Sequence, residues 1–325
     1  MNRKFWDSKH VLITGYEGFL GSWLTKELLK CGARITGIDK IKNRPLSVLD
    51  NLRSRIKCVK GDISNFSLVK DLIDKEKPNV IFHLAAEAIV GEANKNPTRA
   101  FKSNIEGTWN VLEASRGKEY VGAIIAASSD KAYGSSKVLP YDEDTPLRGA
   151  HPYDVSKSCS DLLCYAYYNT YNVPACVTRC GNIFGPGDSH FSRVVPDAIR
   201  CIFNNKQFII RSDGKFTRDY VYVEDIVNGY IRLAEKVKKL KLYGEAFNFS
   251  NENPITVVDI VKKIYSLTGK RPKYKILNKA KYEIKHQYLC SDKARKILGW
   301  KPEYTLEKGL KKTIEWYGEK LDAEK

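Results

Sequence analysis

The sequence contains no long run of apolar residues. Nowhere in its 325 residues is there a stretch approaching the roughly 20 consecutive apolar residues that a membrane-spanning helix needs. Residues 1–7 also lack the apolar core of a signal peptide. We therefore expect a cytoplasmic protein with no membrane partner.

Closely spaced metal-ligand residues are also missing. The eight cysteines are scattered without any C-x-x-C pair, and the five histidines form no cluster. Structural metal sites depend on such spacing. We expect no metal ion, and reduced, mostly buried thiols.

Acidic residues are outnumbered by basic ones. The sequence has 55 Lys and Arg against 38 Asp and Glu, a net charge of +17. The densest basic runs, residues 236–241 and 270–281, lack the aromatic platforms and motifs of the common nucleic-acid-binding modules. The surplus indicates a lysine-rich exterior that could also steer an anionic substrate inward. We expect no nucleic-acid partner.

The first half of the sequence alternates between two kinds of segment. Continuous apolar strands separated by helices are typical of a parallel sheet that is covered on both faces. The pattern predicts an α/β fold with a Rossmann-type, doubly wound parallel sheet. The strand-like runs are residues 11–13, 34–38, 58–59, 80–84, 123–126 and 175–178, and the helical segments are 21–30, 67–76, 100–116 and 152–171.

The pattern of predicted elements changes after about residue 180, where glycine and proline residues separate shorter elements. This predicts a smaller, mixed α/β lobe that covers the substrate. The helical segment 223–236 and the strand-like segment 246–249 could return to the first lobe, so we expect interleaved lobes. The prediction assigns residues 1–180 and 222–253 to a dinucleotide-binding domain and residues 181–221 and 254–325 to the second lobe.

A glycine-rich turn follows the first strand. Gly15, Gly18 and Gly21 are spaced to allow a tight turn, close approach of a pyrophosphate and close packing of the next helix. The spacing differs from the usual G-x-G-x-x-G fingerprint, and glycine turns also occur without a ligand. Because this turn opens a helix, we expect it to bind a dinucleotide together with Phe19 and Leu20.

The second strand ends in an acidic residue. Asp39 could accept both hydroxyl groups of an adenine ribose, and it favours NAD over NADP because a 2′-phosphate would meet its charge. Lys40, Lys42 and Arg44 follow and could offset that preference.

Two later strand ends add candidate cofactor contacts. Asp62 and Ile63 follow the third strand and could meet the adenine, although Asp62 could instead cap a helix before Phe66. Leu84, Ala85 and Ala86 end the fourth strand with small residues that allow close approach of the cofactor.

A tyrosine and a lysine lie four residues apart at the start of a helix that Pro152 opens. Tyr153 and Lys157 therefore share one helix face. A nearby ammonium group and a positively charged nicotinamide both favour the phenolate. Tyr153 could then take a proton from a sugar hydroxyl group while hydride leaves for NAD, with Lys157 holding the nicotinamide ribose. An isolated pair of this kind usually only packs, but here it follows a nucleotide-binding sheet and a strand that ends at Ser129.

These motifs together resemble the extended short-chain dehydrogenase/reductase family, the NAD-dependent epimerases and dehydratases that modify nucleotide sugars. Residues 179–187, 218–225 and 298–302 resemble the same family, so the resemblance covers nearly the whole chain. It implies NAD as cofactor, a nucleotide-sugar substrate, and a homodimer formed through the helices near residues 100–116 and 152–171.

Within the family, Asp130 and Lys131 separate two activities. The pair replaces the small or uncharged residues of similar epimerases, and resembles CDP-glucose 4,6-dehydratases and some UDP-N-acetylglucosamine dehydratases. This resemblance implies that Asp130 is the acid for the departing C6 hydroxyl group and Lys131 the base at C5. An ion pair on a loop surface is the alternative interpretation of the pair.

The resemblance also implies substrate contacts by Asn182 and Arg218 at the diphosphate, with Glu87 and Arg193 near the sugar or diphosphate. Surface or loop-capping roles are the alternative for Asn182 and Arg218. We predict a nucleotide-sugar 4,6-dehydratase that converts CDP-glucose or a related NDP-hexose to an NDP-4-keto-6-deoxyhexose, with NAD as a recycled hydride carrier. A 4-epimerase is the first alternative, and a non-catalytic nucleotide-binding protein is the second.

Overall fold

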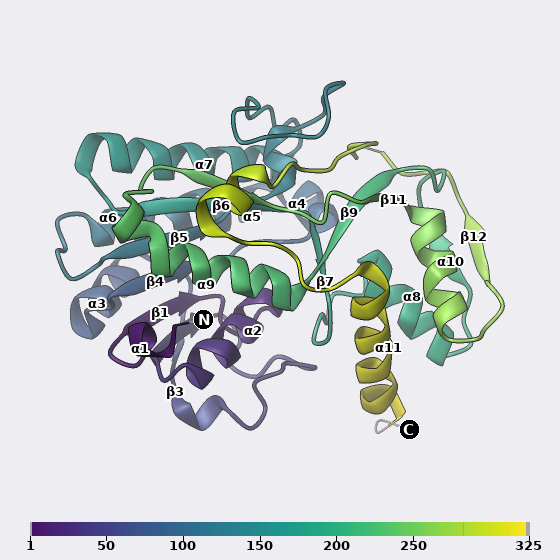
Figure 1. The fold of residues 1–325 in the computed structure, drawn as a ribbon, viewed down its shortest axis with the longest axis horizontal. Helices are drawn as coiled ribbons and strands as arrows, with labels where there is room; N and C mark the ends of the chain where they lie inside the picture. The colour runs from purple at the N-terminus through teal and green to yellow at the C-terminus, as the bar shows by residue number, and fades with distance from the viewer. Residues whose placement is uncertain (1, 282, 323–325) are drawn as a thin grey trace.

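The computed structural model describes residues 2–281 and 283–322. Its main feature is a seven-stranded sheet in the order β3-β2-β1-β4-β5-β6-β10, in which every neighbouring pair is parallel (Figure 1). This order is that of a doubly wound Rossmann-type sheet, which confirms the predicted fold class. The strands are β1 (His10–Thr14), β2 (Arg34–Asp39), β3 (Ile56–Lys60), β4 (Val80–His83), β5 (Ala123–Ala127), β6 (Ala175–Cys180) and β10 (Ala246–Phe249).

The apolar strands supply side chains to both faces of this sheet. In β1, Val11 and Ile13 lie in one buried cluster, whereas Leu12 lies in the other. Successive side chains of a strand point to opposite faces, so a strand that is apolar at every position must be covered twice.

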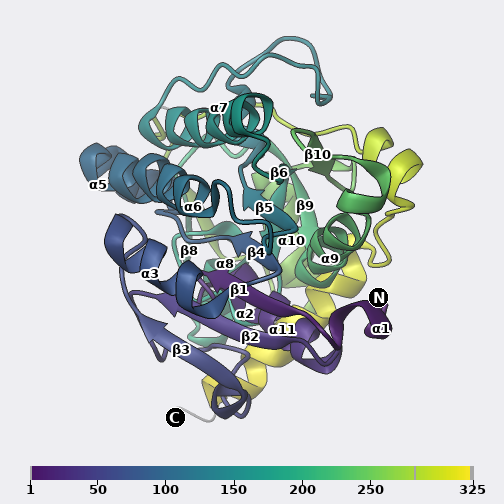
Figure 2. The same ribbon diagram turned by 90° about the vertical axis from the view of Figure 1, so that its left-hand side faces the viewer.

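Helices cover the two faces (Figure 2). One layer contains α1 (Arg3–Trp6), α2 (Phe19–Lys30) and α9 (Val223–Leu240), and the other contains α3 (Phe66–Glu76), α6 (Gly107–Ser115) and α7 (Pro152–Tyr171). No helix in the described part of the chain is both long and apolar enough to cross a membrane. No disulfide joins any of the eight cysteines, all of which are described.

The helix predicted over residues 100–116 is interrupted. The structure has α4 (Val90–Lys95), α5 (Pro97–Phe101), a π-helical turn η2 (Lys102–Glu106) and then α6. Inside the wide turn, the Asn104 side-chain amide donates to Ser156 Oγ at 2.8 Å and accepts from the Glu87 backbone N–H at 2.7 Å. π turns often serve to aim a side chain, and here Asn104 ties α7 to the segment after β4.

The second lobe is built from short elements around its own aromatic core, to the right of the large sheet in Figure 1. Its three-stranded sheet has the order β11-β9-β7, and β12 pairs with β8. These strands are β7 (Asn182–Phe184), β8 (Phe208–Ile210), β9 (Thr217–Tyr222), β11 (Pro254–Thr256) and β12 (Tyr274–Ile276), and the helices are α8 (Val194–Phe203), α10 (Val257–Leu267) and α11 (Leu306–Asp322).

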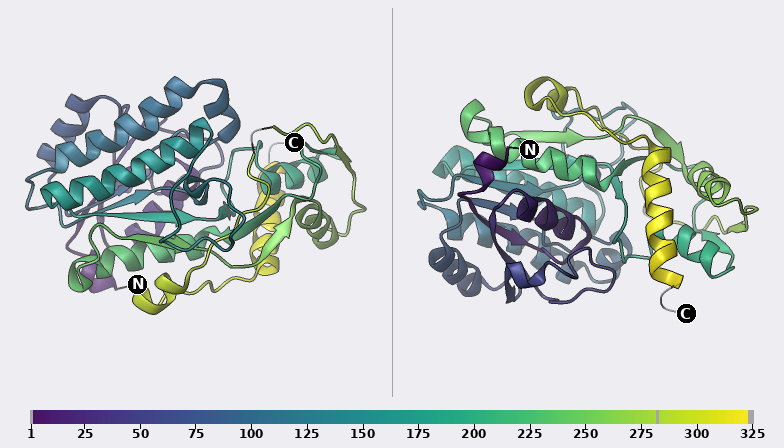
Figure 3. Two further views of the ribbon diagram at one scale, coloured as in Figure 1. Left: turned by 90° about the horizontal axis from the view of Figure 1, so that it is seen from above. Right: turned by 60° about the horizontal axis from the view of Figure 1, so that its bottom comes forward.

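The two lobes interleave along the chain. After β9 the chain returns as α9 and β10, and β10 completes the edge of the large sheet beside β6. Residues 254–325 were all assigned to the second lobe, but Ala294 and Leu298 of η4 (Ala294–Leu298) and Trp300 pack in the core of the first. Trp300 is fixed there because its indole N–H donates to the Asp225 carbonyl at 2.9 Å. We therefore propose that the first lobe also includes this segment, while α11 stands with the second (Figure 3).

Candidate active site

The predicted cofactor residues from Gly15 to Ala86, and Ser129 to Lys131, lie at or after the carboxyl ends of parallel strands, which meet at one edge of the large sheet. Gly15 adopts the left-handed conformation with φ +73°, and a Cβ there would lie 2.8 Å from the Ala85 backbone. Gly18 precedes α2 without any side-chain cap, so the first N–H groups of the helix remain open to an anion. This cradle fits the diphosphate of a dinucleotide.

The other predicted cofactor residues next to the glycine turn, Phe19, Leu20 and the segment 84–86, offer mainly backbone groups. Phe19 and Leu20 pack their side chains against the first core. They are the first two residues of α2, so their N–H groups have no acceptor within the helix and could bind a ligand. The Thr14 hydroxyl accepts from the backbone N–H groups of Leu84 and Ala85, both at 3.1 Å, and so holds the segment 84–86 beside the glycine turn.

At the end of β2, the half-buried Asp39 carboxylate accepts backbone N–H groups of Glu17 at 3.3 Å and Ile41 at 3.1 Å. Burial raises the pKa of this carboxyl group, and the hydrogen bond from Ile41 opposes the rise. Asp39 therefore lies at the open edge of the glycine turn, where an adenine ribose would be placed.

Asp62 does not cap α3, so that alternative is wrong. Asn65 is the cap residue, and its side chain accepts the Leu68 N–H at 3.1 Å. The Asp62 carboxylate instead accepts the Ser64 N–H at 3.0 Å and pairs with Lys40 at 2.9 Å. Burial alone would raise the pKa of Asp62, but these two partners lower it. The adjacent Ile63 side chain is buried in the second core.

Tyr153 and Lys157 begin α7, with Pro152 in its first turn, and both are buried. Burial raises the pKa of Tyr153 to about 12, against the lowering effects of the Ser129 hydrogen bond and the Arg193 charge. Burial also lowers the pKa of Lys157 to about 8. Its ammonium group donates to the Ala127 carbonyl at 2.7 Å. In the protein alone, burial outweighs the Ser129 hydrogen bond and the Arg193 charge. That the Lys157 ammonium group and a nicotinamide together favour the Tyr153 phenolate stays a prediction.

Asp130 and Lys131 open the short helix η3 (Asp130–Tyr133), which Ser129 caps. The Ser129 hydroxyl donates to Asp130 Oδ1 at 3.0 Å and accepts the Lys131 N–H at 3.2 Å. Lys131 Nζ lies 3.4 Å from Asp130 Oδ1 and 3.5 Å from Asn182 Oδ1. Asp130 is only 2% exposed, so a loop-surface ion pair does not describe this corner.

The predicted substrate residues fall into two groups. Asn182 contacts Lys131, and the Arg193 charge reaches Tyr153 while its guanidinium pairs with Asp188 at 3.0 Å. Arg218 and Glu87 are engaged elsewhere. Arg218 donates to the Thr217 and Lys285 carbonyls at 2.8 and 3.1 Å, and Glu87 pairs with Arg99 at 2.5 Å.

Sequence analysis missed two buried polar residues of this site. His83 lies between Thr14 at 2.9 Å and Thr108 at 3.1 Å, and burial lowers its pKa to about 3, so it is neutral beside the Lys157 charge. Asp154 is 3% exposed. Burial raises its pKa, and the Lys131 charge partly offsets that rise. The sequence features that could have indicated them are a histidine within an apolar strand and an acidic residue directly after Tyr153.

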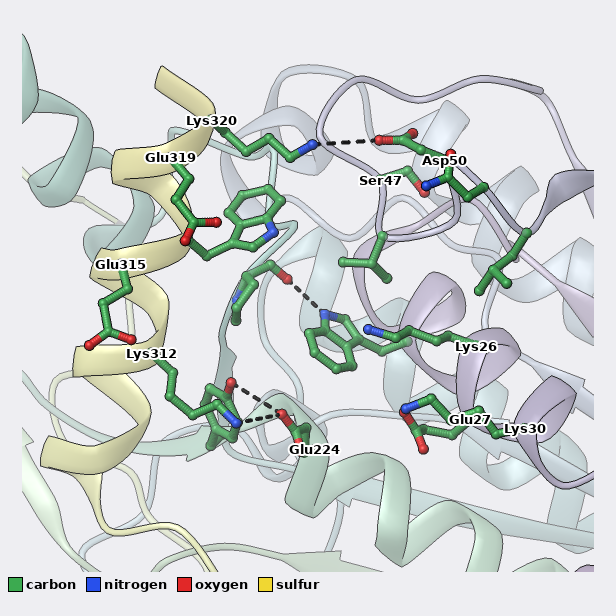
Figure 4. Close-up of a pocket in the computed structure, with 17 residues that line it drawn as sticks. Lys26, Glu27, Lys30, Ser47, Asp50, Glu224, Lys312, Glu315, Glu319 and Lys320 are labelled. Atoms are coloured by element: carbon green, nitrogen blue, oxygen red, sulfur yellow. Dashed lines mark hydrogen bonds and ion pairs between the residues drawn. The ribbon is translucent and has the colours of Figure 1, made fainter. Parts of the chain in front are cut away.

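A separate cavity of about 730 Å³ lies between α2, α11 and the loop after β2 (Figure 4). Trp23 and Trp316 line it, and Lys320 approaches Asp50 to 3.8 Å across it. None of the predicted site residues lines this cavity. It is therefore distinct from the candidate active site.

The comparisons with known proteins agree with this geometry. Residues 12–313 match the family model described as GDP-mannose 4,6 dehydratase. The chain belongs to this family. This confirms the resemblance inferred from the motifs.

Individual relatives include both dehydratases and epimerases. The chain is 31% identical to a CDP-glucose 4,6-dehydratase of Salmonella typhimurium, over 98% of this chain and 92% of the relative. It is 32% identical to a UDP-glucuronate 4-epimerase of Thermodesulfobacterium geofontis, over 96% of this chain and 97% of the relative. A dTDP-glucose 4,6-dehydratase from Bacillus anthracis, solved in complex with NAD, superposes with a TM-score of 0.85 at 28% identity, covering 97% and 98% of the two chains.

Proposed function

We propose that this chain is an NAD-dependent nucleotide-sugar 4,6-dehydratase. It converts CDP-glucose or a related NDP-hexose to the NDP-4-keto-6-deoxyhexose and water. The observation that carries the proposal is the corner formed by Ser129, Asp130 and Lys131, where a buried carboxyl group and an amine adjoin the Tyr153 phenol. The similarity to CDP-glucose and dTDP-glucose 4,6-dehydratases supports it.

The residues that would hold NAD fit it. The Gly15 turn has no room for a side chain, the start of α2 is open, and Asp39 offers carboxylate oxygens to a ribose. When bound, NAD supplies a hydride acceptor for C4 of the sugar and a hydride donor for C6.

Tyr153 and Ser129 act on the C4 hydroxyl group in this proposal. Ser129 hydrogen-bonds the hydroxyl group, and Tyr153 takes its proton in the phenolate form, which the positive charge of a bound nicotinamide would favour. Lys157 holds the neighbouring ribose through its buried ammonium group. These three residues would serve an epimerase equally well.

Asp130 and Lys131 supply the steps that make the reaction a dehydration. With the pair in its neutral form, the Lys131 amine would take the C5 proton and the Asp130 carboxyl group would give its proton to the C6 oxygen, which leaves as water. The proton that Tyr153 took from the C4 hydroxyl group would then restore the Asp130 carboxyl group. Lys131 then returns its proton to C5 when C6 has received hydride. Asn182 orients Lys131 through its side-chain oxygen.

On the substrate side, Arg193 and Asn182 lie nearest the reacting groups, and Arg218 is the candidate diphosphate contact on β9. Glu87 stays a candidate contact of the sugar or diphosphate, with its carboxylate paired to Arg99 and its backbone bonded to Asn104.

Product analysis tests the proposal. The protein is incubated with CDP-, dTDP-, UDP- and GDP-linked sugars, and the product masses are recorded. A dehydratase gives a product lighter by one water, whereas a 4-epimerase gives an isomer of unchanged mass. Asp130→Asn and Lys131→Ala should lower dehydration by about 100-fold or more, and the exposed Lys137→Ala should not. Parent rates in both site variants would refute the assignment.

A homodimer and a cytoplasmic location belong to the same proposal. Three neighbouring helices of one layer, α5, α6 and α7, expose large apolar side chains. We infer that these side chains share one surface, which would mark an interaction site. They are Phe101, Trp109, Leu162 and Tyr165.

A further inference from the structure

The loop between β2 and the short helix η1 (Arg53–Arg55) lies over the glycine turn. We propose that Arg44, on this loop, binds the diphosphate of the dinucleotide. This inference rests on the proposed function, because it adds a residue to the NAD site.

A buried carboxylate fixes the backbone of Arg44 against the glycine turn. Glu17, within that turn, is 1% exposed. It accepts the Arg44 backbone N–H at 3.2 Å and two Arg53 side-chain hydrogen bonds at 2.8 and 3.1 Å. Because Glu17 is held from both sides, residue 44 stays beside Gly15 and Gly18.

The second lobe holds the same loop from its other side. Gly187 has a left-handed φ of +87°, and a Cβ there would lie 3.0 Å from Val48 Cγ1 and 3.2 Å from the Leu46 carbonyl oxygen. The Trp23 indole N–H donates to the neighbouring Pro186 carbonyl at 2.7 Å. The loop therefore lies between the glycine turn and the segment that leads to His190.

One nitrogen of the Arg44 guanidinium group has no hydrogen-bond partner in the described part of the chain. Its Nε atom is buried and makes no hydrogen bond within the described residues. The Glu17 carboxylate, the nearest acid on the turn, is already paired with Arg53. A planar guanidinium group suits a phosphate, which can accept two parallel N–H bonds.

The charge of Arg44 reaches residues at both ends of the candidate cofactor site. Burial raises the pKa of Asp39, at the adenine-ribose end, and the Arg44 charge partly offsets that rise. Burial lowers the pKa of His190, and the Arg44 charge lowers it further. The pKa of His190 is also affected by the charges of Glu87 and Arg193, near the catalytic end. The diphosphate joins the two halves of the cofactor, so a cation between these ends meets it. A 2′-phosphate would instead lie at the Asp39 end.

Titration calorimetry on the purified full-length chain tests the inference with NAD and NADP. Arg44→Ala and Arg44→Met should weaken NAD binding by about 10- to 100-fold, as expected for loss of charge-assisted hydrogen bonds. NADP binding should weaken by the same factor. Arg44→Lys should recover part of the affinity, and Lys42→Ala, an exposed lysine of the same loop, should stay within twofold of the parent.

The outcomes separate this inference from the proposed function. If the parent binds NAD and both Arg44 variants bind it equally well, Arg44 is not a diphosphate residue, while the NAD site stands. A larger loss for NADP than for NAD would assign Arg44 to the 2′-phosphate and overturn the inference. Failure of the parent to bind NAD would refute the NAD-dependent function itself. Unchanged melting temperatures of the ligand-free variants check that the losses come from binding.

Discussion

At the scale of single residues, the burial of Lys157 disfavours the charged form of its side chain. The side chain is 5% exposed, and burial lowers its pKa to about 8. One backbone carbonyl, that of Ala127, accepts from the ammonium group at 2.7 Å. Groups kept in such surroundings often serve function at the expense of stability.

Lys157→Met should therefore raise the free energy of unfolding and abolish turnover. The difference between a pKa of about 8 and the usual 10.5 corresponds to roughly 3 kcal/mol. The penalty is fully present in the parent below pH 8 and is relieved as pH rises toward 10.5, because the folded state loses the proton first. Urea unfolding at pH 7 and pH 10 should show the larger gain at pH 7. A gain that grows with pH would contradict this account.

Sequence alone could predict which candidate catalytic residues lie close together, but not the burial and the contacts that surround them. Ser129, Asp130 and Lys131 are consecutive, and Tyr153 and Lys157 share a helix face, so their proximity follows from local geometry. The contact between Lys131 and Asn182 joins two different strand ends. The raised pKa of Tyr153 depends on burial by other elements, which no local pattern specifies.

At the scale of elements, the glycine turn shows how closely β1 and β4 must approach. Gly15 is left-handed, and the Ala85 backbone occupies the space where its side chain would be. Gly91 in α4 offers a matched control, because nothing lies within 4 Å of a Cβ built there.

Gly15→Ala should destabilise the fold by at least about 1–2 kcal/mol from its left-handed backbone alone, and should weaken NAD binding because the turn must shift. Gly91→Ala should leave NAD binding intact and change stability by at most about 1 kcal/mol in the favourable direction. Denaturant unfolding and NAD titration of both variants provide the measurements. Parent-like NAD affinity in Gly15→Ala would argue against the turn as the diphosphate cradle.

Element boundaries were predictable where local signals mark them. The prediction for α7 matches its observed bounds, because Pro152 starts it and Asn172, in the left-handed conformation, ends it. The π turn η2 was missed because Asn104 bonds to Ser156 far along the chain. The three-residue strands β7, β8, β11 and β12 exist only through tertiary pairing, which gives them little signal of their own.

At the scale of the whole molecule, the exposed apolar side chains of α6 and α7 can be tested as an interface. The double variant Trp109→Glu and Leu162→Glu should convert a dimer to a monomer in light scattering, because each carboxylate would be buried against apolar groups. Val138→Glu, at a side chain 78% exposed on a loop, should leave the dimer unchanged. A monomeric parent protein would refute the dimer outright.

The order of the strands also governs how the molecule can be made. A ribosome delivers β6 long before β10, with β7, α8, β8, β9 and α9 in between. Until β10 arrives, the nascent sheet ends in an unpaired parallel edge, the kind of surface on which other chains can add. The first part of the second lobe is thus synthesised before the large sheet of the first lobe is complete. A chain that stalls between Cys180 and Ala246 would leave the ribosome with that edge uncovered.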